Sequence, residues 1–116
     1  MSKISEFKFL SSRGRDIYSK RWLPEASQPR AILQISHGVS EHINRYNDFA
    51  EFMTGHGIAV YGNDHLGHGR SAPLPEDLGF FAESDGWEKV VLDTGRLREI
   101  ASDEFPGLPY FMLGHS

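Results

Sequence analysis

Apolar and polar residues alternate along the first part of the chain with a period near two. The alternation covers Glu6–Leu10 and Asp16–Trp22, and both segments are rich in aromatic or β-branched residues, as strands with one buried face are. The intervening S-S-R-G-R supplies residue types that favour turns. The chain is therefore expected to begin with an antiparallel hairpin.

The period then changes, and short apolar runs alternate with helical stripes. Runs at 31–36, 58–63 and 110–113 predict three strands, of which the last is expected to be a third central strand. Between them, apolar residues three or four positions apart predict two helices. The first stripe is Tyr46, Phe49, Ala50 and Met53, closed by Gly55 and Gly57; the second follows an N-cap at Ser84 and comprises Trp87, Val90, Val91, Thr94, Leu97 and Ala101. Crossover helices imply parallel strands, so the expected fold class is α/β.

Three connections are too rich in Pro, Gly or polar residues for regular structure. Pro24–Arg30 is expected to be a polar linker, and a long loop begins at Asp64. F-P-G-L-P at 105–109 is expected to end the second helix. The order is hairpin, strand, helix, strand, helix, strand.

Composition narrows the class of protein. A chain of 116 residues with 39% hydrophobic residues can bury a sizeable core. Its net charge of -4, without a basic cluster, argues against nucleic acid as a partner. Zero cysteines exclude a disulfide framework and thiolate metal sites. No stretch has the ~20 apolar residues of a membrane helix, and the first residues lack a signal-peptide core, so a cytoplasmic protein is expected.

The last three residues carry the first sign of chemistry. A serine directly after a parallel strand, with glycine two positions before it, is typical of the sharp turn that holds a nucleophile in G-x-S-x-G. Such a turn needs the glycine at position 114, because a side chain there is expected to collide with the neighbouring backbone. Only G-H-S, Gly114 to Ser116, is present, and an ordinary loop serine has the same three letters.

Three segments together resemble the α/β-hydrolase fold, and within it the monoacylglycerol lipase and lysophospholipase group of serine hydrolases. They are S-H-G-V-S-E-H-I-N-R-Y at 36–46, N-D-H-L-G-H-G-R-S at 63–71 and F-P-G-L-P-Y-F-M-L-G-H-S at 105–116. They are similar to that family's oxyanion loop, its D-x-x-G-H-G-x-S loop and its strand into the nucleophile elbow. The resemblance covers nearly the whole chain. It implies that residues 1–116 are the N-terminal portion of a single α/β-hydrolase domain, whose remainder and cap would lie beyond them.

The resemblance also implies roles for particular residues. Ser116 would be the nucleophile, and the Val39 N–H would be one donor of the oxyanion hole. His37 would fix its loop through ring hydrogen bonds, because the base of this fold comes later in the chain. Gly38 would let the backbone approach the acyl carbon, and His115 would be the variable residue of the elbow.

The loop after 58–63 allows rival interpretations. Side-chain to backbone hydrogen bonds are expected to hold Asp64, His65, Gly67, His68 and Gly69 in a tight turn. A metal site from Asp64, His65 and His68 is less favoured, because this spacing in a Gly-rich loop fixes no geometry. G-H-G-R-S-A at 67–72 matches a dinucleotide fingerprint, but that fingerprint must open a helix, and Pro73 and Pro75 follow.

The function that the resemblance implies is hydrolysis of lipid-type carboxylic esters, of the monoacylglycerol or lysophospholipid kind. It would need no metal or cofactor, and its cap could contact a membrane peripherally. A different carboxylesterase or a peptidase fits the same residues, whereas epoxide hydrolases and dehalogenases carry aspartate at the elbow. The alternative from another class is a non-catalytic binding module that keeps the first half of the fold.

Overall fold

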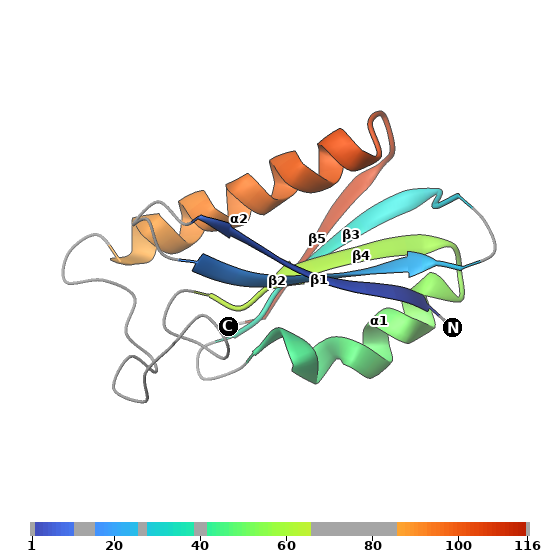
Figure 1. The fold of residues 1–116 in the computed structure, drawn as a ribbon, viewed down its shortest axis with the longest axis horizontal. Coiled ribbons are helices and arrows are strands. Elements are labelled where there is room, and N and C mark those ends of the chain that lie inside the picture. Colours follow the sequence, from blue (N-terminus) through green and yellow to red (C-terminus); the bar gives the residue numbers. More distant parts are fainter. Residues whose placement is uncertain (1, 11–15, 26–27, 39–41, 66–85, 116) are drawn as a thin grey trace.

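A five-stranded mixed sheet with one helix on each face forms the structure, a computed structural model that describes residues 2–10, 16–25, 28–38, 42–65 and 86–115 (Figure 1). The elements in chain order are β1 (Ser2–Leu10), β2 (Asp16–Pro24), β3 (Ala31–Ser36), the 3-10 turn η1 (Ile43–Tyr46), α1 (Asn47–Thr54), β4 (Ile58–Asn63), α2 (Gly86–Glu104) and β5 (Tyr110–Gly114). The α/β class and the order of elements that the sequence predicts are confirmed.

The hairpin of β1 and β2 is longer than the alternation predicts. It pairs in antiparallel register from Leu10↔Asp16 to Ser2↔Pro24. Pro24, expected to begin a polar linker, is instead the last residue of β2. A proline is tolerated there because the end of a strand need not donate to the ladder.

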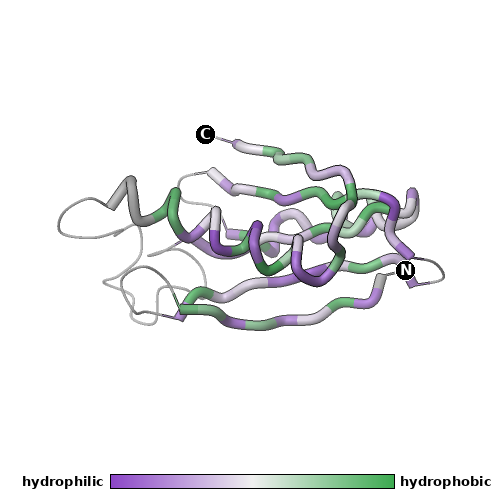
Figure 2. The backbone as a smooth tube through the Cα atoms, turned by 90° about the horizontal axis from the view of Figure 1, so that it is seen from above, coloured by the Kyte–Doolittle hydropathy of each residue, from purple (hydrophilic) through white to green (hydrophobic). Residues whose placement is uncertain are grey.

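The sheet has the order β1-β2-β4-β3-β5. β2 pairs antiparallel with β4, whereas β3 lies between β4 and β5 and is parallel to both. β5 therefore stands at the margin of the part of the sheet that the described residues form (Figure 2), and its assignment as a third central strand stays a prediction. Its side chains agree with this position, because Phe111 is 58% exposed and Met112 49%.

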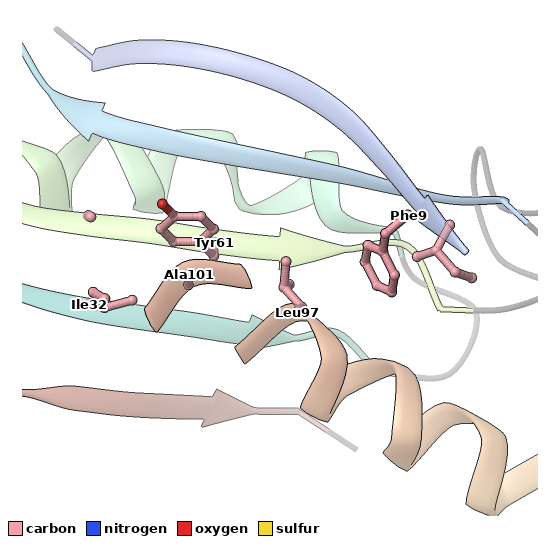
Figure 3. Packing of buried hydrophobic residues seen from close by; sticks show 7 residues of the cluster. Phe9, Ile32, Tyr61, Leu97 and Ala101 are labelled. Carbon is pink, nitrogen blue, oxygen red and sulfur yellow. The ribbon is translucent and has the colours of Figure 1, made fainter. Parts of the chain in front are cut away.

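The helix α2 covers one face of the sheet (Figure 1). Leu97 and Ala101 of this helix are fully buried against Ile32 and Tyr61 of the central strands, together with Phe9 of the hairpin (Figure 3). On the opposite face, Ile43 of η1 and Ala50 of α1 pack on a second cluster of buried residues. That cluster contains Tyr18, Trp22, Ile35 and Val60.

Two details of the helical stripes differ from the prediction. Phe49 and Val91 were expected to face the core, but they are 38% and 54% exposed. Both lie at the borders of their stripes, next to Ala50 and Val90, which are buried. The N-cap predicted at Ser84 lies outside the described residues, whereas the end of α1 before Gly55 and Gly57 is confirmed, with Gly57 at φ +80°.

Candidate active site at the carboxyl edge of the sheet

The parallel strands bring two of the sequence motifs to the same edge of the sheet. Ser36, the last residue of β3, is the register partner of Gly114, the last residue of β5. The His115 N–H then donates to the Ser36 carbonyl oxygen at 3.1 Å. The residues that follow β3 and β5 thus start from adjacent positions, where open α/β sheets bind their ligands.

A reciprocal pair of hydrogen bonds joins the ends of β3 and β4. The main-chain N–H of His65 donates to His37 Nε2 at 2.9 Å, and His65 Nε2 donates to the His37 carbonyl oxygen at 3.0 Å. The two buried rings lie 4.1 Å apart. The loops after these strands are therefore tied together at their first residues.

These partners fix the tautomer of each ring. His37 Nδ1 lies 2.8 Å from the Gly38 carbonyl oxygen, which can only accept, so the proton of His37 is on Nδ1 and Nε2 accepts. The same reasoning places the proton of His65 on Nε2, which also lies 3.2 Å from Ser36 Oγ. His37 is thus a neutral ring that bridges two loops.

Asp64 makes the next connection. Its carboxylate is buried, and Oδ1 accepts a hydrogen bond of 2.6 Å from the main-chain N–H of Ile43, the first residue of η1. A side-chain to backbone hydrogen bond is the kind of interaction that the sequence predicts for Asp64, but the donor belongs to a different loop. The pairing depends on residues 21 positions apart, so no local pattern indicates it.

The residues predicted for catalysis are only partly described. Ser116 and Val39, the predicted nucleophile and oxyanion donor, lie outside the described residues. Gly38, Gly114 and His115 lie at the edge. The expected steric reason for glycine at 114 is not found, because a Cβ built there meets no atom within 4 Å in the described part of the chain.

The rival metal and dinucleotide sites rest mainly on residues that are not described, since His68 and the whole of 67–72 lie outside the described residues. Among the residues that are described, no group of three or more histidine, cysteine, aspartate or glutamate side chains could hold a metal ion. Asp64 accepts a hydrogen bond from Ile43, whereas His65 is hydrogen-bonded to His37, so the two residues have different partners.

Two tyrosines on the α2 face have raised pKa values. Burial raises the pKa of Tyr110 to about 12. Burial, followed by the hydrogen bond to the Glu104 carboxylate, raises the pKa of Tyr61 well above its ordinary value. Both phenols stay neutral near pH 7 and donate hydrogen bonds, Tyr110 to Gln34 and Tyr61 to Glu104.

Comparison with known families shows to which protein family the chain belongs. Residues 27–116 match the family described as serine aminopeptidase, S33. The chain belongs to this hydrolase family. The match spans all three sequence motifs, so the family resemblance predicted from the sequence is confirmed.

Relatives of this S33-family chain are named as lipases. The chain is 40% identical over 100 residues to a monoglyceride lipase homolog of Monkeypox virus, covering 86% of this chain and 34% of that protein. It is 36% identical over 115 residues to a monoacylglycerol lipase of Mycolicibacterium smegmatis, covering 99% of this chain and 39% of the relative. The chain thus spans little more than a third of the length of these relatives.

A solved structure agrees with the family assignment. A thermostable carboxyl esterase from Bacillus coagulans superimposes with a TM-score of 0.88 at 31% identity, over 99% of this chain and 37% of the esterase. The S33-family chain therefore has part of an α/β-hydrolase fold, as the three motifs predict. In the part of it that the structure describes, no helix is long and apolar enough to cross a membrane.

Proposed function

We propose that the protein is a serine ester hydrolase that cleaves lipid esters with one acyl chain, such as monoacylglycerols, through an acyl-enzyme on Ser116. The observation that supports this most is the pairing of Ser36 with Gly114. It brings the beginning of the His37-Gly38 loop beside the strand that leads into G-H-S. Acyl transfer needs this combination, because the nucleophile and the oxyanion donors must face one carbonyl group.

In the proposed reaction, the Ser116 hydroxyl attacks the ester carbonyl while a histidine elsewhere in the protein takes its proton. The negative oxygen of the tetrahedral intermediate accepts hydrogen bonds from main-chain N–H groups, of which Val39 supplies one. The alcohol then leaves with the proton, and water releases the fatty acid from Ser116. His37 is not the base in this scheme, since its Nε2 already accepts the His65 N–H.

An aminopeptidase is the second candidate, because the description of the matched family names that activity. The named relatives favour the ester, since the two lipase names and the carboxyl esterase all refer to ester substrates. Both reactions use the same nucleophile and oxyanion hole. Substrate assays, rather than labelling of the serine, therefore separate them.

The test is fluorophosphonate labelling of the full protein that the gene encodes, followed by intact mass and peptide sequencing. We expect one adduct, on Ser116, and its loss in Ser116→Ala. Ser102→Ala is the matched control, because Ser102 lies on α2 and should leave labelling unchanged. A monoacylglycerol and an amino-acid p-nitroanilide are then compared as substrates.

Each result has a separate meaning. Labelling of Ser116 with turnover of the monoacylglycerol supports the proposal. Turnover of the anilide alone would instead support the aminopeptidase as the function. A protein that is folded but neither labelled nor active would be a non-catalytic member of the family, and the proposed function would be wrong.

A further inference from the structure

We propose that Asp64 is a positioning residue, which holds the far end of the loop joining His37 to Ile43 at a fixed place over the carboxyl edge. This inference rests on the proposed function for its link to catalysis, but its geometry stands on described residues alone. Asp64 is 1% exposed, and its Oδ1 accepts the Ile43 N–H at 2.6 Å. Hydrogen bonds to a charged acceptor are about twice as strong as neutral ones.

Asp64 itself is held in place by the sheet. Its main-chain N–H donates to the Tyr18 carbonyl oxygen of β2 at 2.9 Å, directly after the last residue of β4. The first N–H groups of a helical turn have no partner within that turn. His42, at the N-cap position of η1, makes no capping side-chain hydrogen bond. The first N–H of η1 is therefore capped by the side chain of Asp64, which directly follows β4.

Two further contacts keep η1 against the sheet. The Ile43 side chain is fully buried over Gly62, so closely that a Cβ at Gly62 would lie 2.1 Å from Ile43 Cδ1. Lys20 of β2 donates to the side-chain oxygens of Asn44 and Asn47 at 2.8 and 2.9 Å. The start of η1 is thus fixed by packing, by a carboxylate and by an ammonium group.

The near end of the same loop is held by the neighbouring residue. His65 binds His37 through the reciprocal hydrogen bonds described above. Consecutive residues, Asp64 and His65, therefore secure the two ends of the loop. In general, a loop that is held at both ends has fewer conformations open to it.

Such an anchor has a direct consequence for acyl transfer. An oxyanion donor is effective only when its N–H is aimed before the charge develops, and a misplacement of 1 Å can lower the rate by roughly 100-fold. Loss of the Asp64 acceptor should therefore weaken the enzyme's binding of the transition state more than its binding of the substrate. Substrate binding through other surfaces should change less.

The experiment compares Asp64→Leu, which removes the acceptor, with Asp64→Asn, which keeps one. Tyr61→Phe is the matched control. It also changes a residue of the β4 region and removes a hydrogen bond to a carboxylate, that of Glu104, but this bond lies on the face of the sheet that α2 covers. In the full protein, with p-nitrophenyl butyrate, we expect Asp64→Leu to lower kcat roughly 10- to 100-fold with little change in KM. Asp64→Asn and Tyr61→Phe should stay near the wild-type kcat.

Hydrogen exchange of the Ile43 amide provides a readout independent of activity. In the wild-type protein this amide should exchange slowly, although it is the first residue of its turn, and Asp64→Leu should speed its exchange while Tyr61→Phe does not. Fast exchange in the wild type would overturn the proposal even if Asp64→Leu does not fold.

The outcomes separate the two proposals. If the wild type neither hydrolyses esters nor takes a label on Ser116, the proposed function fails, and exchange of the Ile43 amide alone decides whether Asp64 holds the loop. If the wild type is active and Asp64→Leu retains its kcat, the positioning role is wrong while the proposed function stands.

Discussion

Gly62 illustrates how one residue without a side chain permits the packing around the site. It lies in β4 opposite Ile35, and the Ile43 side chain fills the space above it. Ile43 is fully buried, so its side chain has little freedom to move away. The close approach of η1 to the sheet therefore depends on the absence of a Cβ at this position.

Gly62→Ala should lower the free energy of unfolding by about 1–3 kcal/mol, because an added methyl group overpacks a filled core. Gly95→Ala is the control, since a Cβ there meets no described atom within 4 Å in the middle of α2. That change should raise the free energy of unfolding by about 0.5–1 kcal/mol, because alanine is a better helix former. Urea unfolding measures both, and equal stability of the two variants would contradict the packing argument.

Among the elements, α2 gives the clearest division between a buried and an exposed side. Leu97 and Ala101 are fully buried on the sheet, whereas Val91 and Leu92 are more than half exposed. The helix also secures the polar interior of the sheet, because the Thr94 carbonyl oxygen accepts a hydrogen bond of 2.9 Å from Gln34. β5 is joined to this network, since Tyr110 donates a hydrogen bond to the same Gln34 side chain.

Leu97→Ala is expected to lower the free energy of unfolding by about 2–5 kcal/mol, because it leaves a cavity between α2 and the sheet. Leu92→Ala makes the same chemical change on the same helix at 57% exposure, and it should alter stability by less than about 0.5 kcal/mol. Thermal and urea unfolding of both variants test this. A similar loss in both would mean that α2 is covered on its second side as well.

The type and order of the elements follow from the sequence more readily than their boundaries or the site do. The change of period from two to near four predicts each strand and α-helix among the described residues, and Gly55 and Gly57 mark the end of α1. The number of neighbouring strands of β5 could not be predicted, because an apolar run such as Tyr110–Leu113 does not indicate how many neighbours it has. The Asp64–Ile43 and His37–His65 hydrogen bonds join residues 21 and 28 positions apart, so they exist only once β3 and β4 have paired.

For the molecule as a whole, β5 is the most exposed apolar feature of the described sheet. Phe111, Met112 and Leu113 form a continuous exposed run on a strand that pairs only with β3 among the strands described. Unpaired strand edges with apolar side chains favour association with other chains. The other margin of the sheet, β1, has charged residues between its apolar ones.

The 116-residue chain produced by itself should therefore self-associate through β5. Met112→Lys is expected to weaken this association by roughly ten-fold or more, because a charge at a strand edge opposes pairing. Ile4→Lys is the matched control, since Ile4 has the same exposure of 49% on the opposite margin. Analytical ultracentrifugation measures both variants. An equal effect of the two would place the contact elsewhere than on β5.

The strand order also affects when each strand can pair during synthesis of the chain. β1 and β2 follow one another along the chain and pair in antiparallel register, and such hairpins form within about 1–10 μs. β3, by contrast, needs Tyr110 beside Ile32, and Tyr110 lies 78 residues further along the chain. At about 5–20 residues per second, a ribosome takes several seconds to synthesise that stretch. During this interval β3 has a free edge, and chaperone binding to nascent chains should be strongest there, ending as Gly114 pairs with Ser36.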